Sequence, residues 1–80
     1  MSRNEIFGVL VDVIMDILPE IAREDISYDT SLQDIGANSV DRMDIIIGTM
    51  ETLGIKIPLV KFGEAHCLED IIKTISEGIE

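Results

Sequence analysis

The chain has 80 residues, and 16 acidic and 6 basic side chains give it a formal net charge of -10. This length predicts a single domain over residues 1–80 with a small core, and the acidity argues against binding to nucleic acid or to an anionic membrane. Hydrophobic residues make up 46% of the chain and aromatic residues only 4%. The core must therefore be built from aliphatic side chains.

Residues 4–18 predict the first helix, because apolar residues recur at helical spacing and Pro19 follows them. Acidic residues interrupt this segment, and no stretch of the chain approaches the length of a membrane-spanning helix. We therefore expect a cytoplasmic protein. The residues expected to form the buried face of this helix are Ile6, Val9, Leu10, Val13 and Ile17.

Residues 19–38 lack a sustained helical period. We expect Ile26, Leu32 and Ile35 to hold this long loop against the rest of the protein. Polar side chains at 29–31 predict local hydrogen bonds and a single helical turn. Loops of this length in small domains are often functional.

The second helix is predicted over residues 39–53. Asn38 is expected to cap it, and Asp41 stands where a carboxylate can return a hydrogen bond to the cap backbone. Gly54 is a typical residue just past a helix C-terminus. Ser39 then lies in the first turn with its hydroxyl free to face solvent.

Apolar residues of this second helix spread over an arc too wide to be buried completely if Ser39 is to reach solvent. We expect some of Met43, Ile47 and Met50 to be exposed beside the serine and to offer a docking surface. A core position is the alternative for each of the three. The apolar residues of the arc are Val40, Met43, Ile46, Ile47, Met50 and Leu53.

The C-terminal part predicts an extended connector at 55–58, a short helix at 59–63 and a last helix at 67–79. Phe62 is expected in the core. Cys67 is the one cysteine of the sequence, so it predicts a buried or half-buried thiol in a reducing compartment.

Ser39 is the candidate functional residue. A nucleophilic serine needs a base within hydrogen-bond reach, and the one histidine, His66, belongs to a different segment. The sequence also offers too few clustered ligands for zinc, so catalysis is disfavoured. A helix N-terminus favours an anion, which makes Ser39 a good position for a phosphate ester. The alternative is a first-turn serine without a special role.

The surrounding sequence resembles the acyl carrier proteins, in which the serine follows Gly-x-Asp and precedes leucine. The corresponding residues here are Gly-Ala-Asn-Ser-Val at 36–40, and the similarity includes Thr-Ser-Leu-Gln-Asp-Ile-Gly at 30–36 and Glu-Thr-Leu-Gly-Ile-Lys-Ile-Pro at 51–58. The resemblance implies an all-α four-helix bundle with three main helices, one short helix and a long first loop. It also implies covalent attachment of 4′-phosphopantetheine, taken from coenzyme A, to Ser39.

The resemblance places partner enzymes at the start of the second helix. Asn38 stands where the family usually has aspartate, which implies a different preference of the phosphopantetheinyl transferase. Leu59, Val60 and Phe62 are possible pocket or docking residues, and Arg42 either discriminates among partners or is a solvated helix charge. The expected docking residues are Asn38, Val40, Asp41, Arg42, Met43, Asp44, Ile47, Met50 and Glu51.

The combination Asn-Ser-Val-Asp-Arg at 38–42 is most similar to the free-standing donor carriers of polyketide β-branching cassettes. This implies a non-catalytic, monomeric carrier that presents an acetyl group to an enzyme similar to hydroxymethylglutaryl-CoA synthase. An acyltransferase and a ketosynthase-like decarboxylase would be further partners. A fatty-acid, peptidyl or D-alanyl carrier and an unmodified helical interaction module remain as alternatives.

Overall fold

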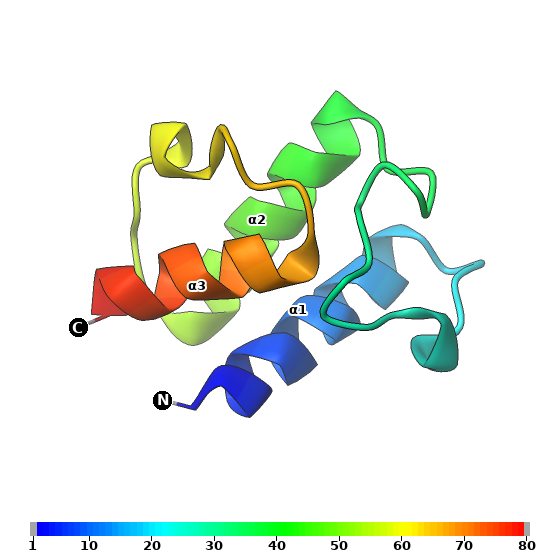
Figure 1. The fold of residues 1–80 in the computed structure, drawn as a ribbon, viewed down its shortest axis with the longest axis horizontal. Helices are drawn as coiled ribbons and strands as arrows, with labels where there is room; N and C mark the ends of the chain where they lie inside the picture. Colours follow the sequence, from blue (N-terminus) through cyan, green and yellow to red (C-terminus); the bar gives the residue numbers. More distant parts are fainter. Residues whose placement is uncertain (1, 80) are drawn as a thin grey trace.

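The computed structural model describes residues 2–79, and within this range the regular elements are helical (Figure 1). This confirms the all-α prediction. The short helix expected at 59–63 is a four-residue 3₁₀ helix rather than an α-helix. In chain order the elements are α1 (Arg3–Ile17), η1 (Arg23–Asp25), α2 (Ser39–Leu53), η2 (Leu59–Phe62) and α3 (Leu68–Ile79).

Helix α1 begins with a capping box that the sequence analysis did not anticipate. Ser2 Oγ accepts a hydrogen bond from the Glu5 N–H at 3.2 Å, and Glu5 Oε1 accepts one from the Ser2 N–H at 3.3 Å. These two bonds satisfy N–H groups that lack partners inside the helix.

The predicted buried face of α1 is partly wrong. Ile6 and Leu10 are fully buried as expected, but Val9, Val13 and Ile17 are only half-buried. Val11 and Ile14 take their place in the core. The segment is apolar on several sides, so its packing partners decide which stripe is buried, and α1 packs against both α2 and α3.

Helices α1 and α2 pack closely at Gly48. A Cβ atom built there would lie 3.1 Å from Val13 Cγ1, a separation tighter than ordinary van der Waals contact. The two helices therefore approach closely at this point, where Val13 is half-buried.

The long segment between α1 and α2 is held by buried apolar residues and by hydrogen bonds to the start of α3. Ile26 and Leu32 are buried, whereas Ile35 is half-buried. The backbone carbonyls of Thr30 and Tyr28 each accept an N–H from the first turn of α3 at 3.0 Å. The predicted helical turn at 29–31 is wrong, because residue 31 pairs with Cys67 in an isolated β-bridge and the one-turn helix η1 forms earlier.

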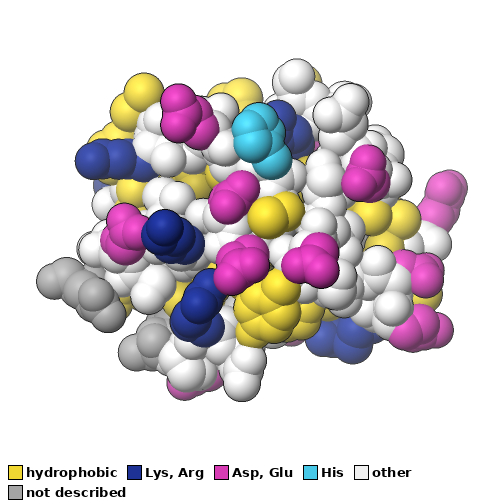
Figure 2. All heavy atoms as spheres, viewed as in Figure 1, with side chains coloured by type: hydrophobic (Ala, Val, Ile, Leu, Met, Phe, Trp, Pro, Cys, Tyr) yellow, Lys and Arg dark blue, Asp and Glu magenta, His cyan; other side chains and the backbone are white. Residues whose placement is uncertain are grey.

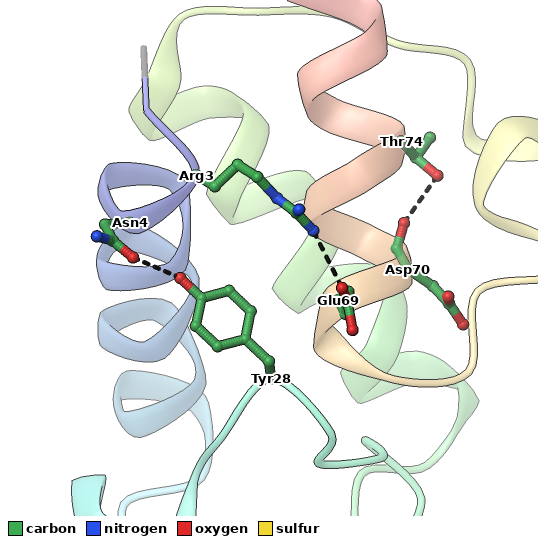
Figure 3. A network of polar contacts seen from close by, with 6 residues as sticks. All are labelled: Arg3, Asn4, Tyr28, Glu69, Asp70 and Thr74. Carbon is green, nitrogen blue, oxygen red and sulfur yellow. Dashed lines mark hydrogen bonds and ion pairs between the residues drawn. The ribbon is translucent and has the colours of Figure 1, made fainter.

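Polar contacts connect the start of α1 to this segment and to α3 (Figure 3). Tyr28 stacks on Phe7 with ring centroids 4.3 Å apart, and its hydroxyl donates to Asn4 Oδ1 at 2.7 Å. Arg3 pairs with Glu69 at 3.3 Å. The N-terminal end of α1 is thus surrounded by polar partners.

The core is aliphatic, as the composition predicted. Helix α3 contributes Leu68, Ile71, Ile72 and Ile75, and Phe62 of η2 is buried with 3% exposure, as expected for Phe62. None of the described helices combines the length and the apolar character needed to cross a membrane. Acidic side chains are spread over the face shown in Figure 2, between apolar and uncharged ones.

Candidate functional site at the start of α2

The first turn of α2 has the local geometry that the sequence predicted. Asn38 is extended, with φ -83° and ψ -176°, and its Oδ1 accepts the Asp41 N–H at 2.8 Å. Asp41 Oδ2 in return accepts the Asn38 N–H at 3.3 Å. The chain turns into this cap at Gly36, whose φ of +88° favours glycine. Ser39 is therefore the first residue of a helix whose N-terminus is stabilised by a capping box.

The Ser39 side chain is exposed, and its hydroxyl makes no hydrogen bond to any residue between 2 and 79. The N–H groups of Ser39 and Val40 lie too early in α2 to have partners inside the helix. Donors of this kind, together with the positive end of the helix dipole, stabilise an anion. The site can thus present a hydroxyl to an incoming reagent and hold a negative charge near it afterwards.

A cavity of about 390 Å³ opens beside Ser39, between the first turns of α2 and the η2 turn. Figure 1 shows η2 (yellow) next to α2 (green). The residues that line the cavity are Ser39, Arg42, Met43, Ile46, Leu59, Val60, Phe62 and Gly63.

Exposed apolar side chains gather around this cavity. Val40 is 65% exposed, Met43 49%, Leu59 38% and Val60 83%. Among residues 2–79, the other large apolar side chain with comparable exposure is Ile79, near the end of α3. A patch of this kind beside a reactive group is typical of a surface that binds other proteins. We refer to Val40, Met43, Leu59 and Val60 as the α2–η2 patch.

The predicted docking residues differ in how exposed they are in the structure. Asn38, Val40, Met43, Asp44 and Glu51 are exposed, as a docking role requires. Asp41, Arg42 and Ile47 are half-buried, so less of each is available to a partner.

Met50 is buried, with 7% exposure, which removes it from the predicted docking surface. The connector after α2 folds back over it. The Ile55 N–H donates to the Met50 carbonyl at 3.0 Å, and the Ile57 N–H donates to the Met50 sulfur at 3.4 Å. The buried side of α2 also differs from the predicted arc, because it consists of Ile45, Ile46, Thr49 and Met50.

Arg42 is not the solvated helix charge that the sequence also allowed. Its Nη2 donates to the Ala65 carbonyl at 2.9 Å in a partly buried position. Since Ala65 lies 23 residues further along the chain, no local sequence signal could have revealed this contact.

A second cavity, of about 630 Å³, lies on the other side of Leu59. The C-terminal half of α2 and the connector to η2 form it, and Leu59 borders both cavities. The connector residues 55–58 were not among the residues predicted from the sequence to line a pocket. The residues around this second cavity are Ile47, Met50, Glu51, Ile55, Lys56, Ile57, Pro58 and Leu59.

The remaining residues that the sequence analysis considered for chemistry are His66, Cys67 and possible metal ligands. His66 is exposed, and its backbone N–H donates to Asp70 Oδ2 at 3.1 Å, which lowers the pKa of that carboxyl. Cys67 is half-buried, as predicted. Over residues 2–79, no three His, Cys, Asp or Glu side chains lie close enough to hold a metal ion.

Comparisons with known proteins find similarity over most or all of the chain. The family described as "Phosphopantetheine attachment site" matches residues 8–75 of this chain. The chain is also similar to the "Polyketide biosynthesis acyl-carrier-protein AcpK" of Bacillus subtilis (strain 168), with 29% identity over 80 residues, which cover 100% of this chain and 98% of that protein. Matches of this extent include both cavities and the whole of α2.

Proposed function

This chain belongs to the acyl carrier proteins, the family that carries a covalent 4′-phosphopantetheine, and we propose that Ser39 is its attachment residue. Members of the family are non-catalytic carriers. The observation that supports Ser39 most strongly is its exposed, unbonded hydroxyl at the capped start of α2.

The other serines of the sequence are poorer candidates. The hydroxyls of Ser2, Ser27 and Ser31 take part in hydrogen bonds with residues two or three positions away. Ser76 lies on α3 and is half-buried. Ser39 alone among these serines combines exposure with the free N–H groups of a first helical turn.

The surroundings of Ser39 fit a phosphate ester. In loading, Ser39 Oγ would bond to the phosphorus atom of coenzyme A that bears the pantetheine, the pyrophosphate P–O bond would break, and 3′,5′-ADP would leave. The hydroxyl proton would pass to a base of the phosphopantetheinyl transferase. Once attached, the group supplies a thiol that holds an acyl chain as a thioester. The N–H groups of Ser39 and Val40 would lie near the negative charge of the ester.

The α2–η2 patch is the surface on which we propose that partner enzymes dock. It surrounds Ser39, and the exposed carboxylates of Asp44 and Glu51 on α2 add charge for basic partners. Partners that bind transiently need a small apolar centre with a polar rim. Docking contacts of this kind would be brief and repeated, which suits a carrier that visits several enzymes.

For the cargo, we propose an acetyl group that is donated during polyketide β-branching to an enzyme similar to hydroxymethylglutaryl-CoA synthase. The run Asn-Ser-Val-Asp-Arg at 38–42 supports this choice, as does the polyketide biosynthesis named in the relative's title. An acyltransferase would load a malonyl group onto the thiol of the arm, and a ketosynthase-like decarboxylase would release CO₂ from it to leave the acetyl thioester. Residues 1–80 would act as one carrier domain.

Loading is tested by the intact mass after incubation with coenzyme A and a broad-specificity phosphopantetheinyl transferase. We expect the wild type to gain one phosphopantetheine and Ser39→Ala to gain none. Ser76→Ala is the matched control, and it should be loaded like the wild type. A folded wild type that gains nothing from two different transferases would instead support an unmodified interaction module.

The cargo is tested with protein that has been loaded with an acetyl thioester. We expect an enzyme similar to hydroxymethylglutaryl-CoA synthase to take the acetyl group from this carrier faster than from a fatty-acid carrier protein. Equal rates would argue for one of the other carrier types. The attached acid in the producing cell would then identify which one.

A further inference from the structure

Arg42 lies one helical turn beyond Ser39 and is the one basic residue in α2. Residues three apart in a helix share a face, with about 5–6 Å between their Cβ atoms. Both side chains also line the same cavity of about 390 Å³. The guanidinium is thus within reach of a group attached to the serine.

The Arg42 side chain is held in place by the protein. Its Nη2 donates to the Ala65 carbonyl at 2.9 Å, which connects α2 to the segment between η2 and α3. A guanidinium has five N–H donors in a planar fork, so most of its donors remain available after this contact. A side chain that is already ordered loses less conformational entropy when it binds a second group.

No carboxylate among residues 2–79 forms an ion pair with Arg42. The ion pairs among the described residues are Arg3 with Glu69 and Arg23 with Asp12. Asp41, next to Arg42 in sequence, bonds instead to the Asn38 N–H. Arg42 is thus a half-buried cation beside the candidate attachment residue, held by a carbonyl and, among residues 2–79, without a carboxylate partner, so its free N–H groups can bind an anion there.

We propose that Arg42 is a positioning residue that binds the phosphodiester of the arm on Ser39 and directs the arm into the cavity between α2 and η2. This inference rests on the proposed attachment to Ser39. One edge of the guanidinium keeps the Ala65 carbonyl, and the remaining N–H groups bond the phosphate oxygens. Arginine suits both contacts at once, because charge-assisted bonds to phosphate use a fork geometry that lysine lacks.

The test compares the protein before and after loading by nuclear magnetic resonance, with intact mass as proof of attachment. On loading, the Arg42 Nε–Hε resonance should shift, and its exchange with water should slow about threefold, as for a partly exposed charge pair. Arg3 and Arg23 are internal controls whose resonances should not move. This comparison needs no variant, so it stands even if changes at Arg42 disturb folding.

Variants then identify the phosphate as the partner. In loaded Arg42→Gln the ³¹P resonance should shift and narrow towards that of the loaded chain unfolded in denaturant, where the phosphodiester contacts only solvent. Loaded Lys61→Gln, which removes an exposed cation from η2, should keep the wild-type resonance. An Arg42 resonance that is the same before and after loading overturns this inference alone, because the mass gain still supports the carrier function. A failure to load any arm on Ser39 overturns both.

Discussion

Helices α1 and α2 begin with the same kind of cap, but the residues around the two helix starts differ. Each has a capping box, made by Ser2 and Glu5 in α1 and by Asn38 and Asp41 in α2. At α1 the neighbouring polar side chains pair with each other, as with Arg3 and Glu69 (Figure 3). The α2 start instead has an unbonded serine, an unpaired cation and the α2–η2 patch.

The comparison distinguishes the features that stabilise a helix start from those that make it a candidate functional site. A capped helix start with free N–H groups is common in proteins, so it does not by itself indicate a functional site. The α2 start becomes a candidate site because apolar side chains remain exposed around it and a cavity adjoins it. The following predictions test whether the two starts differ in this way.

The largest effect is expected from charge in the α2–η2 patch. Met43→Glu combined with Val60→Glu should lower the rate of acyl transfer to a partner enzyme about thirtyfold, or ~2 kcal/mol, the cost of losing central interface contacts. Helicity by circular dichroism should not change, since both side chains face solvent. Ile79→Glu is the matched control, because it alters an exposed apolar residue outside the patch. Transfer at the wild-type rate in the double variant would contradict docking on this patch.

Removal of either N-cap should lower the stability of the protein by a similar amount, but only removal of the α2 cap should affect loading. Ser2→Ala and Asn38→Ala should each lower the free energy of unfolding by about 1 kcal/mol, the usual value of an N-cap side chain. This is measured by denaturant titration. Only Asn38→Ala should also slow loading, since its cap fixes the backbone at Ser39. If Ser2→Ala slowed loading equally, the effect would be one of overall stability. Asn38→Asp keeps a cap and should retain the free energy of unfolding of the wild type.

The ion pair at the α1 start should contribute little. The side chains of Arg3 and Glu69 are 54% and 53% exposed, and such pairs are worth about 0.5 kcal/mol after screening by solvent. A double-mutant cycle with Arg3→Met and Glu69→Gln measures the coupling. A coupling of several times that value would mean that the α1 start is more rigid than its exposure suggests.

A third helix start, that of α3, gives the smallest expected effect. The pKa of Asp70 is lowered in the folded protein, chiefly by the His66 N–H. A carboxyl with a depressed folded pKa stabilises the protein above its unfolded pKa, near 4, and this contribution is lost as the pH falls through the folded value. Asp70→Asn should therefore reduce the difference in stability between neutral and acidic pH. An unchanged pH profile would show that this bond adds nothing.

The sequence predicted the features that depend on neighbouring residues. The bounds of α2, its cap at Asn38 and its end at Gly54, where φ is +71°, all follow from local residue types. The capping box of α1 could have been found in the same way, because Ser2 and Glu5 have the typical spacing.

The sequence-based predictions failed where contacts between distant segments determine which side chains are buried or held in place. Met50 is buried because the connector folds back onto it, and Arg42 is fixed by a carbonyl 23 residues away. The buried stripe of α1 depends likewise on α2 and α3. Helical period alone does not choose among several apolar stripes.

The most direct test of the central claim is tandem mass spectrometry of protein that has been loaded by a phosphopantetheinyl transferase and then cut after its arginines. Cleavage after Arg23 and Arg42 leaves Ser27, Ser31 and Ser39 in one fragment, and fragmentation within it separates the three. We predict that phosphopantetheine is found on Ser39 and that the fragment with Ser2 is unmodified. Phosphopantetheine on any other serine would contradict the account of the α2 start given above.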